Sequence, residues 1–478
     1  MMLFLLAQAV FTGNQACAPC HKGIFESYQR TPMARSTGLV TGGVPPGTFR
    51  HAESATTYTI TAEGMAGGRK LNYFIGSGEA GRSYLYSLAG FLFQAPITWY
   101  SQKGRWDMSP GYEHDRDPLW NRAVTPNCLF CHASQARPIY GTENQYADPP
   151  FLQNGVGCER CHGPGSEHVN GTGRMVNPSK LDASRRDSVC AQCHLSGEAR
   201  VEKAGKAVAM YRAGDLLGDF ASYFVFTGGQ SADIKATGYV EKFAGSRCKQ
   251  ESGDRLWCGS CHDPHSVPGR ERRVSYFREK CLACHPQSHA NGSGGPDCIG
   301  CHMPRERVVD GGHGVLTDHS IPKRARKLAV EPANGWKLEP FLGAGEAREL
   351  GLAYAEVGLR TRDRVQQDEA MRLLSPLAVD PEVAVRLGDL LQRKGQTSRA
   401  GQLYLLAPNS IVALVNLGGI HGSRGEYDKA IRLWRSALEK NPGQREASLN
   451  LARTLRALGL SAEAAKVEAA MRRFEDRK

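Results

Sequence analysis

The spacing of apolar residues divides this chain into three parts. From about Glu331 onward the chain is rich in Ala, Leu, Glu and Arg, and its apolar and small residues recur at helical spacing. Residues 45–125 instead alternate or cluster β-forming residues between Gly-rich turns, which predicts a small antiparallel sheet. The remaining residues show neither pattern over a long stretch, so we expect short helices and irregular loops there.

Within the β-rich part, Gly-rich turns at 64–68 and 76–81 separate the candidate strands. Its aromatic residues Trp99, Tyr100 and Trp106 fit core or cofactor packing better than a ligand site. The candidate strands are 58–60, 71–75, 84–88 and 91–93.

One short pattern, Cys-x-x-Cys-His, occurs seven times. It is the attachment pattern of c-type haem, in which both thiols bond to the porphyrin and the His ligates iron. We number the copies 1 to 7 along the chain; they are Cys17–His21, Cys128–His132, Cys158–His162, Cys190–His194, Cys258–His262, Cys281–His285 and Cys298–His302.

These motifs predict seven covalently bound haem c groups. A zinc site of four thiolates is the alternative, but it would not need a His after every Cys pair. The proximal iron ligands are His21, His132, His162, His194, His262, His285 and His302. The attaching thiols are Cys17, Cys20, Cys128, Cys131, Cys158, Cys161, Cys190, Cys193, Cys258, Cys261, Cys281, Cys284, Cys298 and Cys301.

Cys248 is the one Cys outside the motifs, so no thiol pair remains for a disulfide. It fits a buried thiol acting as a small hydrophobe, and an axial thiolate or a reactive thiol stays open as an alternative.

The formal net charge of +12 counts no cofactor. A ferric haem with two ionised propionates carries about −1, so seven haems lower the net charge to roughly +5. This argues against nucleic acid as a partner. Lys and Arg runs such as 270–273 and 323–327 fit solvated faces or propionate partners.

A closed haem needs a second, distal ligand. Of the eight His outside the motifs, His421 lies in the helical C-terminal part and fits packing. Met33 is a further candidate as an axial thioether, or it packs on a haem edge. The seven remaining distal candidates are His51, His114, His168, His265, His289, His313 and His319.

Three of these His stand in patterns that resemble the hydroxylamine oxidoreductase superfamily of multihaem cytochromes, which includes that enzyme's tetrahaem electron acceptor. The resemblance extends over about 12–325 and begins with the segment after motif 1, 22–36. It implies distal roles for the His of Cys158-Glu-Arg-Cys-His-Gly-Pro-Gly-Ser-Glu-His168, Cys258-Gly-Ser-Cys-His-Asp-Pro-His265 and Thr317-Asp-His319.

Two departures weaken any transfer of catalytic activity from that superfamily. No motif ends in Lys, as the catalytic haem of pentahaem nitrite reductases often does. We also identify no Tyr equivalent to the one that crosslinks the hydroxylamine-oxidising haem.

Residues 411–444 are similar to a tetratricopeptide repeat, a helical pair of about 34 residues. A shortened copy precedes it and a partial copy follows, which predicts a small solenoid of three helical pairs. The residues on repeat positions are Leu414, Leu417, Gly418, Ala430, Trp434, Ala437 and Pro442.

We therefore expect a mainly α fold with little regular structure around the haems. Residues 1–11 fit the remnant of a signal peptide, since they are apolar but too short to span a bilayer. Residues 12–325 form the cytochrome region with its β-rich insert at 45–125, 326–344 a linker, and 345–478 the repeat region.

The near-complete supply of distal ligands favours a periplasmic or otherwise exported electron carrier over a catalyst. Its partners would be redox proteins, docked through the repeat region. The alternative is an oxidoreductase in which one open haem, either the first with Met33 or one near His114, acts on a small nitrogen or sulfur compound. A third hypothesis makes the repeat region dominant and the cytochrome a tethered electron source.

Overall fold

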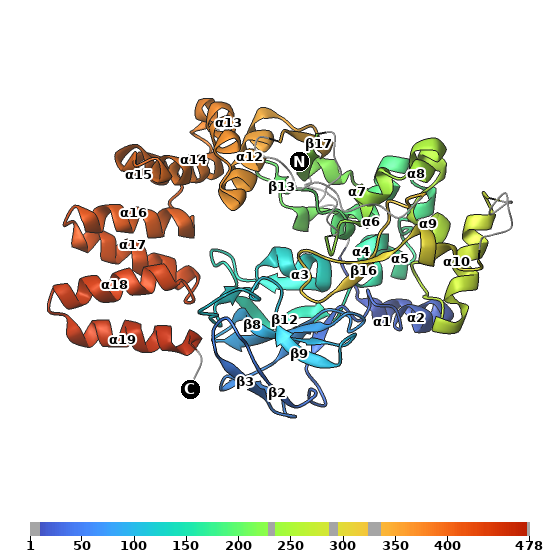
Figure 1. The fold of residues 1–478 in the computed structure, drawn as a ribbon, viewed down its shortest axis with the longest axis horizontal. Coiled ribbons are helices and arrows are strands. Elements are labelled where there is room, and N and C mark those ends of the chain that lie inside the picture. The colour runs from blue at the N-terminus through green and yellow to red at the C-terminus, as the bar shows by residue number, and fades with distance from the viewer. Residues whose placement is uncertain (1–9, 228–234, 286–294, 324–335, 476–478) are drawn as a thin grey trace, which may run out of the picture.

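The computed structural model describes residues 10–227, 235–285, 295–323 and 336–475. The β-rich part lies at the bottom of Figure 1, the motif-bearing helices lie to its right and above, and the paired helices form an arc on the left. Within the described ranges, no helix is long and apolar enough to cross a membrane.

Two antiparallel sheets form the β-rich insert. The long strand β8 (Phe91–Tyr100) pairs with β7, β9 and β10, and its alternate residues Phe93, Ala95 and Ile97 are fully buried. The first sheet also contains β1 (Thr37–Leu39), β6 (Tyr73–Ile75), β7 (Arg82–Leu88), β9 (Arg105–Met108) and β10 (Arg122–Ala123). The second contains β2 (Gly47–Arg50), β3 (Thr57–Ile60), β4 (Met65–Ala66) and β5 (Arg69–Lys70).

Short helices carry or border the haem motifs. They are α1 (Asn14–Cys17), α2 (Lys22–Tyr28), α3 (Pro126–His132), α4 (Cys158–His162), α5 (Ser166–Val169), α6 (Ala183–His194), α7 (Tyr239–Ala244), α8 (Arg247–Ser252), α9 (Cys258–Cys261), α10 (Arg273–Leu282) and α11 (Cys298–His302). Strand pairs connect them: β11 (Ser134–Pro138) with β12 (Tyr146–Gln153), β13 (Ala199–Glu202) with β14 (Ala221–Phe226), and β15 (Arg305–Arg307) with β16 (Val315–Thr317).

The repeat region contains four helical pairs, one more than the sequence predicts. Small residues allow the two helices of a pair to approach closely: a Cβ on Gly388 would lie 2.6 Å from Tyr404, and one on Gly418 would lie 2.5 Å from Trp434. The helices are α12 (Ala347–Thr361), α13 (Arg364–Leu374), α14 (Pro381–Arg393), α15 (Thr397–Tyr404), α16 (Ile411–Ser423), α17 (Tyr427–Lys440), α18 (Arg445–Ala457) and α19 (Ser461–Met471).

The boundary between the two regions differs from the expected linker at 326–344. Residues Leu338–Leu342 form strand β17, which pairs with β14 and completes a three-stranded sheet. Phe224 of that sheet and Leu352 of α12 belong to one buried cluster, so the cytochrome and repeat regions share a core.

Candidate haem sites

Three motif imidazoles lie opposite an imidazole from a distant segment. Each pair joins one proximal His to one predicted distal His. The ring centroids are 6.3 Å apart for His21 and His168, 5.9 Å for His162 and His265, and 6.1 Å for His262 and His319.

This spacing fits two ligands of one iron. A nitrogen–metal distance of about 2 Å on each side, with roughly 1.1 Å from each nitrogen to its ring centre, separates the ring centres by roughly 6.2 Å. The ring planes are also close to parallel, at 12° to 27°. Aromatic rings in direct contact cover a similar range of distances, but here every pair has the same composition of one motif and one non-motif His. These donor sets suit haems with two axial imidazoles.

The three pairs follow one rule along the chain. His168 follows motif 3 and lies opposite motif 1, His265 follows motif 5 and lies opposite motif 3, and His319 follows motif 7 and lies opposite motif 5. Each proximal His is therefore paired with a distal imidazole from the segment that follows the motif two copies further along the chain.

Backbone carbonyls orient several of these rings. The Nδ1–H of His162 donates to the Val176 carbonyl at 2.8 Å, and that of His319 donates to Thr317 at 3.0 Å. The same contact from His302 reaches Pro322 at 3.1 Å. In His162 and His319 the hydrogen bond at Nδ1 leaves Nε2 as the ligand atom, which is the usual arrangement around metal-bound His.

Burial favours the neutral form of several of these imidazoles. It lowers the pKa of His132 to about 4, and it lowers the pKa of His162, His194 and the distal His319 as well. Iron binds the neutral form of imidazole, so these sites favour the ligand state without a change of protonation.

Thiol contacts show which motifs are neighbours. Side-chain hydrogen bonds join Cys17 to Cys158, Cys131 to Cys193, Cys190 to Cys258 and Cys281 to Cys298. The Gln192 amide of motif 4 donates to the Arg160 carbonyl of motif 3 at 3.4 Å, and Cys261 of motif 5 lies within electrostatic range of Cys284 of motif 6. Motifs 1, 3, 4, 5, 6 and 7 therefore form a continuous series, and motif 2 branches from motif 4.

Two predicted distal ligands form hydrogen bonds with residues of the insert instead of facing a motif His. His51 has Nδ1 2.9 Å from the Ser54 hydroxyl and Nε2 3.0 Å from the Glu113 carbonyl. His313 has Nε2 2.8 Å from the Asp107 carboxylate. In this arrangement neither residue offers a free Nε2, so the structure does not support their predicted role.

His114 is exposed in a loop. Among the described residues, no motif imidazole contacts it. His289 lies outside the described ranges. The Ser36 hydroxyl is 2.8 Å from the carbonyl oxygens of both Met33 and His132. The Met33 backbone therefore lies beside motif 2, whereas the sequence placed this residue with motif 1.

Unpaired polar atoms gather between motifs 2, 3 and 4. The Arg160 Nε, the Gln192 amide oxygen and the Tyr211 hydroxyl are buried and have no hydrogen-bond partner among the described residues. The Arg160 guanidinium lies 4.3 Å from the Phe130 ring centre, and its Nη2 donates to the Ala133 carbonyl at 3.5 Å. Buried polar groups need partners, and a haem propionate would supply the acceptor that the Arg160 Nε and the Tyr211 hydroxyl lack.

Sequence reasoning missed two residues of these sites. Arg160 stands inside motif 3, where a cation close to a porphyrin was a usable signal. Tyr239 begins α7 with no distinguishing pattern, yet its ring centre lies 5.6 Å from that of His194 and 4.8 Å from that of His319.

Cys248 lies near Cys261 and Cys281, beside motifs 5 and 6.

The paired imidazoles, the seven motifs and the solenoid define a multihaem c-type cytochrome with a C-terminal tetratricopeptide-repeat region. The family model described as cytochrome c554 and c-prime matches residues 99–163. The tetratricopeptide repeat model matches residues 423–474. Heme c is therefore the cofactor class of this chain.

Similar proteins are other multihaem cytochromes. Multiheme cytochrome MtrA of Shewanella baltica is 24% identical over 34% of this chain and 52% of its own length. Dissimilatory sulfite reductase MccA of Wolinella succinogenes is 26% identical over 32% of this chain and 22% of its own length. The chain thus matches about half or less of these relatives. The crystal structure of the outer cell wall cytochrome OcwA is 15% identical, covers 90% of this chain and 99% of its own, and has a TM-score of 0.42.

Proposed function

We propose that this chain is an exported electron-transfer protein that carries seven haem c groups. The three imidazole pairs carry this proposal, because a haem with two strong protein ligands exchanges electrons without opening a site to substrate. The resemblance to multihaem cytochromes supports the same class.

The order of motif contacts supports a route for electrons. Motif residues that lie close to one another would bring the attached porphyrins close together, and the series 1, 3, 4, 5, 6, 7 extends through the motif-bearing part. Both ends of the series are exposed, at Cys20 and His21 on one side and at Cys284, His285 and Cys301 on the other; Cys128 of the branching motif 2 and His262 of motif 5 are exposed as well. Redox protein partners would exchange electrons at these ends.

The repeat region supports protein interaction as a second part of the proposal. Surfaces of the solenoid that the rest of the chain leaves exposed would dock a redox partner.

Two measurements on the purified holoprotein test the proposal. Iron and haem analysis is expected to give seven haems per chain, and electron paramagnetic resonance is expected to show mainly low-spin ferric haem. A haem content well below seven, or a dominant high-spin signal, would contradict it.

A second candidate function is an oxidoreductase with one open haem, at motif 2. By the rule that the three observed pairs follow, the distal ligand of motif 2 would come from the segment after motif 4. That segment, 195–257, contains no His. The sequence favoured the first motif as the open haem, but its His21 lies opposite His168. The pairing rule therefore makes motif 2 the better candidate.

Carbon monoxide binding to the reduced holoprotein tests this candidate. Carbon monoxide is expected to bind the reduced holoprotein, and the double change Cys128→Ala and Cys131→Ala is expected to remove one equivalent of that binding. The same double change at Cys158 and Cys161 serves as the matched control and should leave it intact. Absence of binding in the seven-haem protein would exclude the open haem while leaving electron transfer in place.

A further inference from the structure

We propose that the repeat region acts as a brace inside the molecule: its first and last helices bind different parts of the cytochrome region and hold the β-rich insert in place against the motif-bearing helices. This role goes beyond electron transfer and does not depend on the haems.

The first end of the brace is anchored through β17 and α12. β17 extends the sheet of β13 and β14, and the Arg348 guanidinium donates to the Glu202 carbonyl at 3.0 Å. Arg360 donates to the Glu198 carbonyl, also at 3.0 Å. These elements also share one buried hydrophobic cluster, which joins the start of the repeat region to the sheet that follows motif 4.

The second end is anchored in the core of the insert. Phe474, which follows α19, is 4% exposed and belongs to the insert's main buried cluster, with its ring centre 5.0 Å from that of Phe93. The Trp120 amide donates to the Phe474 carbonyl at 2.8 Å. The buried Arg69 guanidinium donates to the carbonyls of Arg473 and Glu475, at 2.5 and 2.7 Å. An apolar anchor with saturated backbone acceptors is typical of a stable interface.

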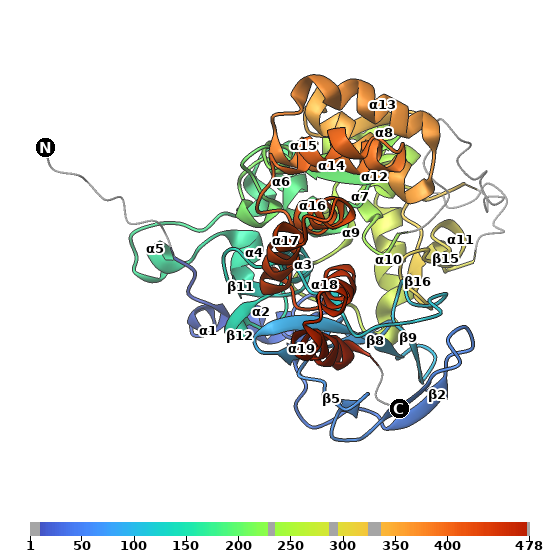
Figure 2. The same cartoon turned by 90° about the vertical axis from the view of Figure 1, so that its left-hand side faces the viewer.

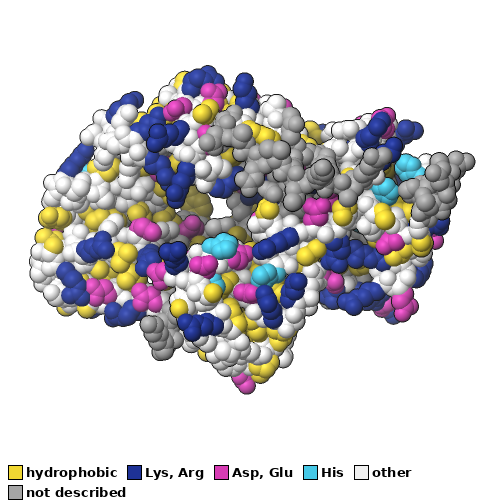
Figure 3. Space-filling model, in the orientation of Figure 1, with side chains coloured by type: hydrophobic (Ala, Val, Ile, Leu, Met, Phe, Trp, Pro, Cys, Tyr) yellow, Lys and Arg dark blue, Asp and Glu magenta, His cyan; other side chains and the backbone are white. Residues whose placement is uncertain are grey.

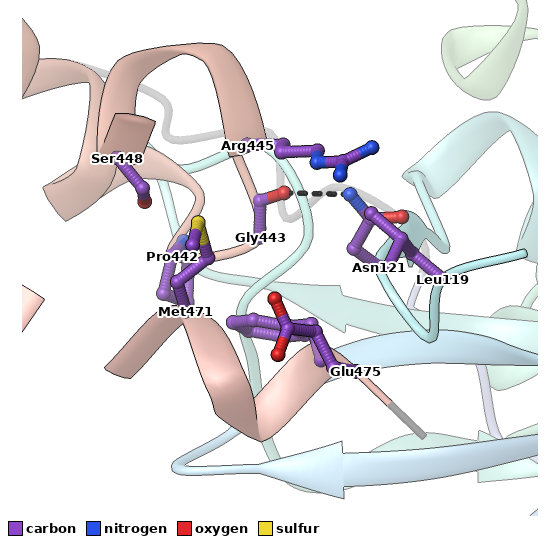
Figure 4. A pocket seen from close by; sticks show the side chains of 9 residues that line it. Leu119, Asn121, Pro442, Gly443, Arg445, Ser448, Met471 and Glu475 are labelled. Atoms are coloured by element: carbon purple, nitrogen blue, oxygen red, sulfur yellow. Dashed lines mark hydrogen bonds between the residues drawn. The ribbon is translucent and has the colours of Figure 1, made fainter. Parts of the chain in front are cut away.

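The turn between α17 and α18 adds a third contact. The Asn121 amide donates to the Gly443 carbonyl at 2.9 Å, as Figure 4 shows, and the Glu143 amide donates to Lys440 at 3.0 Å. A Cβ on Gly443 would lie 2.8 Å from the Phe93 ring, so this approach depends on glycine. We call the contacts of Gly443 and Phe474 with the insert the closing contact.

The closing contact completes a ring. The solenoid leaves the cytochrome region at β17, arcs away from it and returns to it at the C-terminal end of α19, which comes close to β8 (Figures 1 and 2). Figure 3 shows an opening through the molecule between the arc and the rest. Because both ends are bound, the repeat region cannot swing as a tethered module would, and it links two parts of the cytochrome region that lie far apart.

Two backbone amides report directly on this brace. The N–H groups of Trp120 and Glu143 belong to the cytochrome region, whereas their acceptors Phe474 and Lys440 belong to the repeat region. Hydrogen exchange of the holoprotein is expected to show both amides protected. Exchange of both at the rate of an open loop would overturn the brace outright.

Variants then test its effect on the insert. Phe474→Ala and Gly443→Ala are expected to speed exchange at these amides, and in β8, by at least about tenfold, while haem content and the low-spin spectrum stay unchanged. Gly419→Ala is the matched control for Gly443→Ala, because a Cβ at Gly419 meets no atom within 4 Å. It should change nothing.

The two variants distinguish a brace from a passive contact. Faster exchange in α18 and α19 without any change in β8 would show that the insert does not depend on the repeat region and would refute the proposal. If Phe474→Ala prevents folding, Gly443→Ala and the wild-type protection of Trp120 and Glu143 still decide the question.

Discussion

At the scale of single residues, the distal imidazoles decide what each haem does. His168, His265 and His319 stand in short local patterns, and each lies opposite a motif His in the structure. His51 and His313 are the same residue type in the same chain, but contacts with Glu113 and Asp107 occupy their Nε2 atoms. Residue type alone therefore did not separate ligands from structural His.

Replacing one distal imidazole is expected to open one haem. His168→Ala, His265→Ala and His319→Ala should each convert about one haem from low spin to high spin, because an iron that loses one axial imidazole has no ready substitute. Electron paramagnetic resonance and the visible spectrum measure the change. His421→Ala, in the repeat region beside Glu426, is the control and should leave the spectrum unchanged. If all three variants remained fully low spin, the assignment of these His residues as distal ligands would be wrong.

Arg160 is expected to raise the potential of a central haem. A buried cation favours the ferrous state, which carries one positive charge less than the ferric state, so Arg160→Gln should lower the reduction potential of one haem. Potentiometric titration followed by visible spectroscopy measures the shift. Arg185→Gln changes an exposed Arg that is paired with Asp182, and it should not alter the titration. Equal titrations of both variants and the wild type would exclude a propionate partner at Arg160.

At the scale of elements, small residues control how closely helices pair. Gly418 stands where α16 meets Trp434 of α17, and the neighbouring Gly419 meets nothing within 4 Å. The repeat pattern alone identifies Gly418, because a helix pair can close only over a small side chain. Strand β17 has no such local signal, because Leu338–Leu342 contains Pro340 and forms a strand only beside β14.

Enlarging Gly418 is expected to weaken the solenoid. Gly418→Val should lower the free energy of unfolding by about 1–3 kcal/mol, because the new side chain collides with Trp434. Thermal or urea unfolding, followed by helical circular dichroism, measures the loss. Gly419→Val places the same side chain one residue along without a steric neighbour, so an equal loss in both variants would point to helix propensity instead.

At the scale of the whole molecule, charged contacts join the repeat region to the cytochrome region. Arg348 bonds to the Glu202 carbonyl and to Asp380, at 3.0 and 2.9 Å. Partial burial opposes ionisation of Asp380, but Arg348 and the backbone amides of Val383 and Glu382 hold its pKa below the ordinary value. The same carboxylate caps α14, so it stabilises both the helix and the junction.

This pair predicts a pH-dependent junction. A carboxylate whose pKa is lowered by folding stabilises the native state above its unfolded pKa of about 3.9, and that stability is lost as the pH falls through the folded pKa. Asp380→Asn keeps a capping side chain and removes the charge, so it should lower the urea midpoint at neutral pH. The gap to the wild type should close below the pKa of Asp380. A gap that does not depend on pH would show that the charge has no role.

The sequence by itself determined the haem chemistry and the elements with strong local periodicity. Covalent attachment needs two Cys and a His at fixed local spacing, and a helical repeat needs small and large residues at fixed intervals, so both are readable within a few residues. Tertiary structure decided which imidazoles lie opposite one another, how the motifs are ordered in space, and that Phe474 closes the repeat region onto Phe93. Such contacts join residues hundreds of positions apart, and only the packing of whole elements selects them.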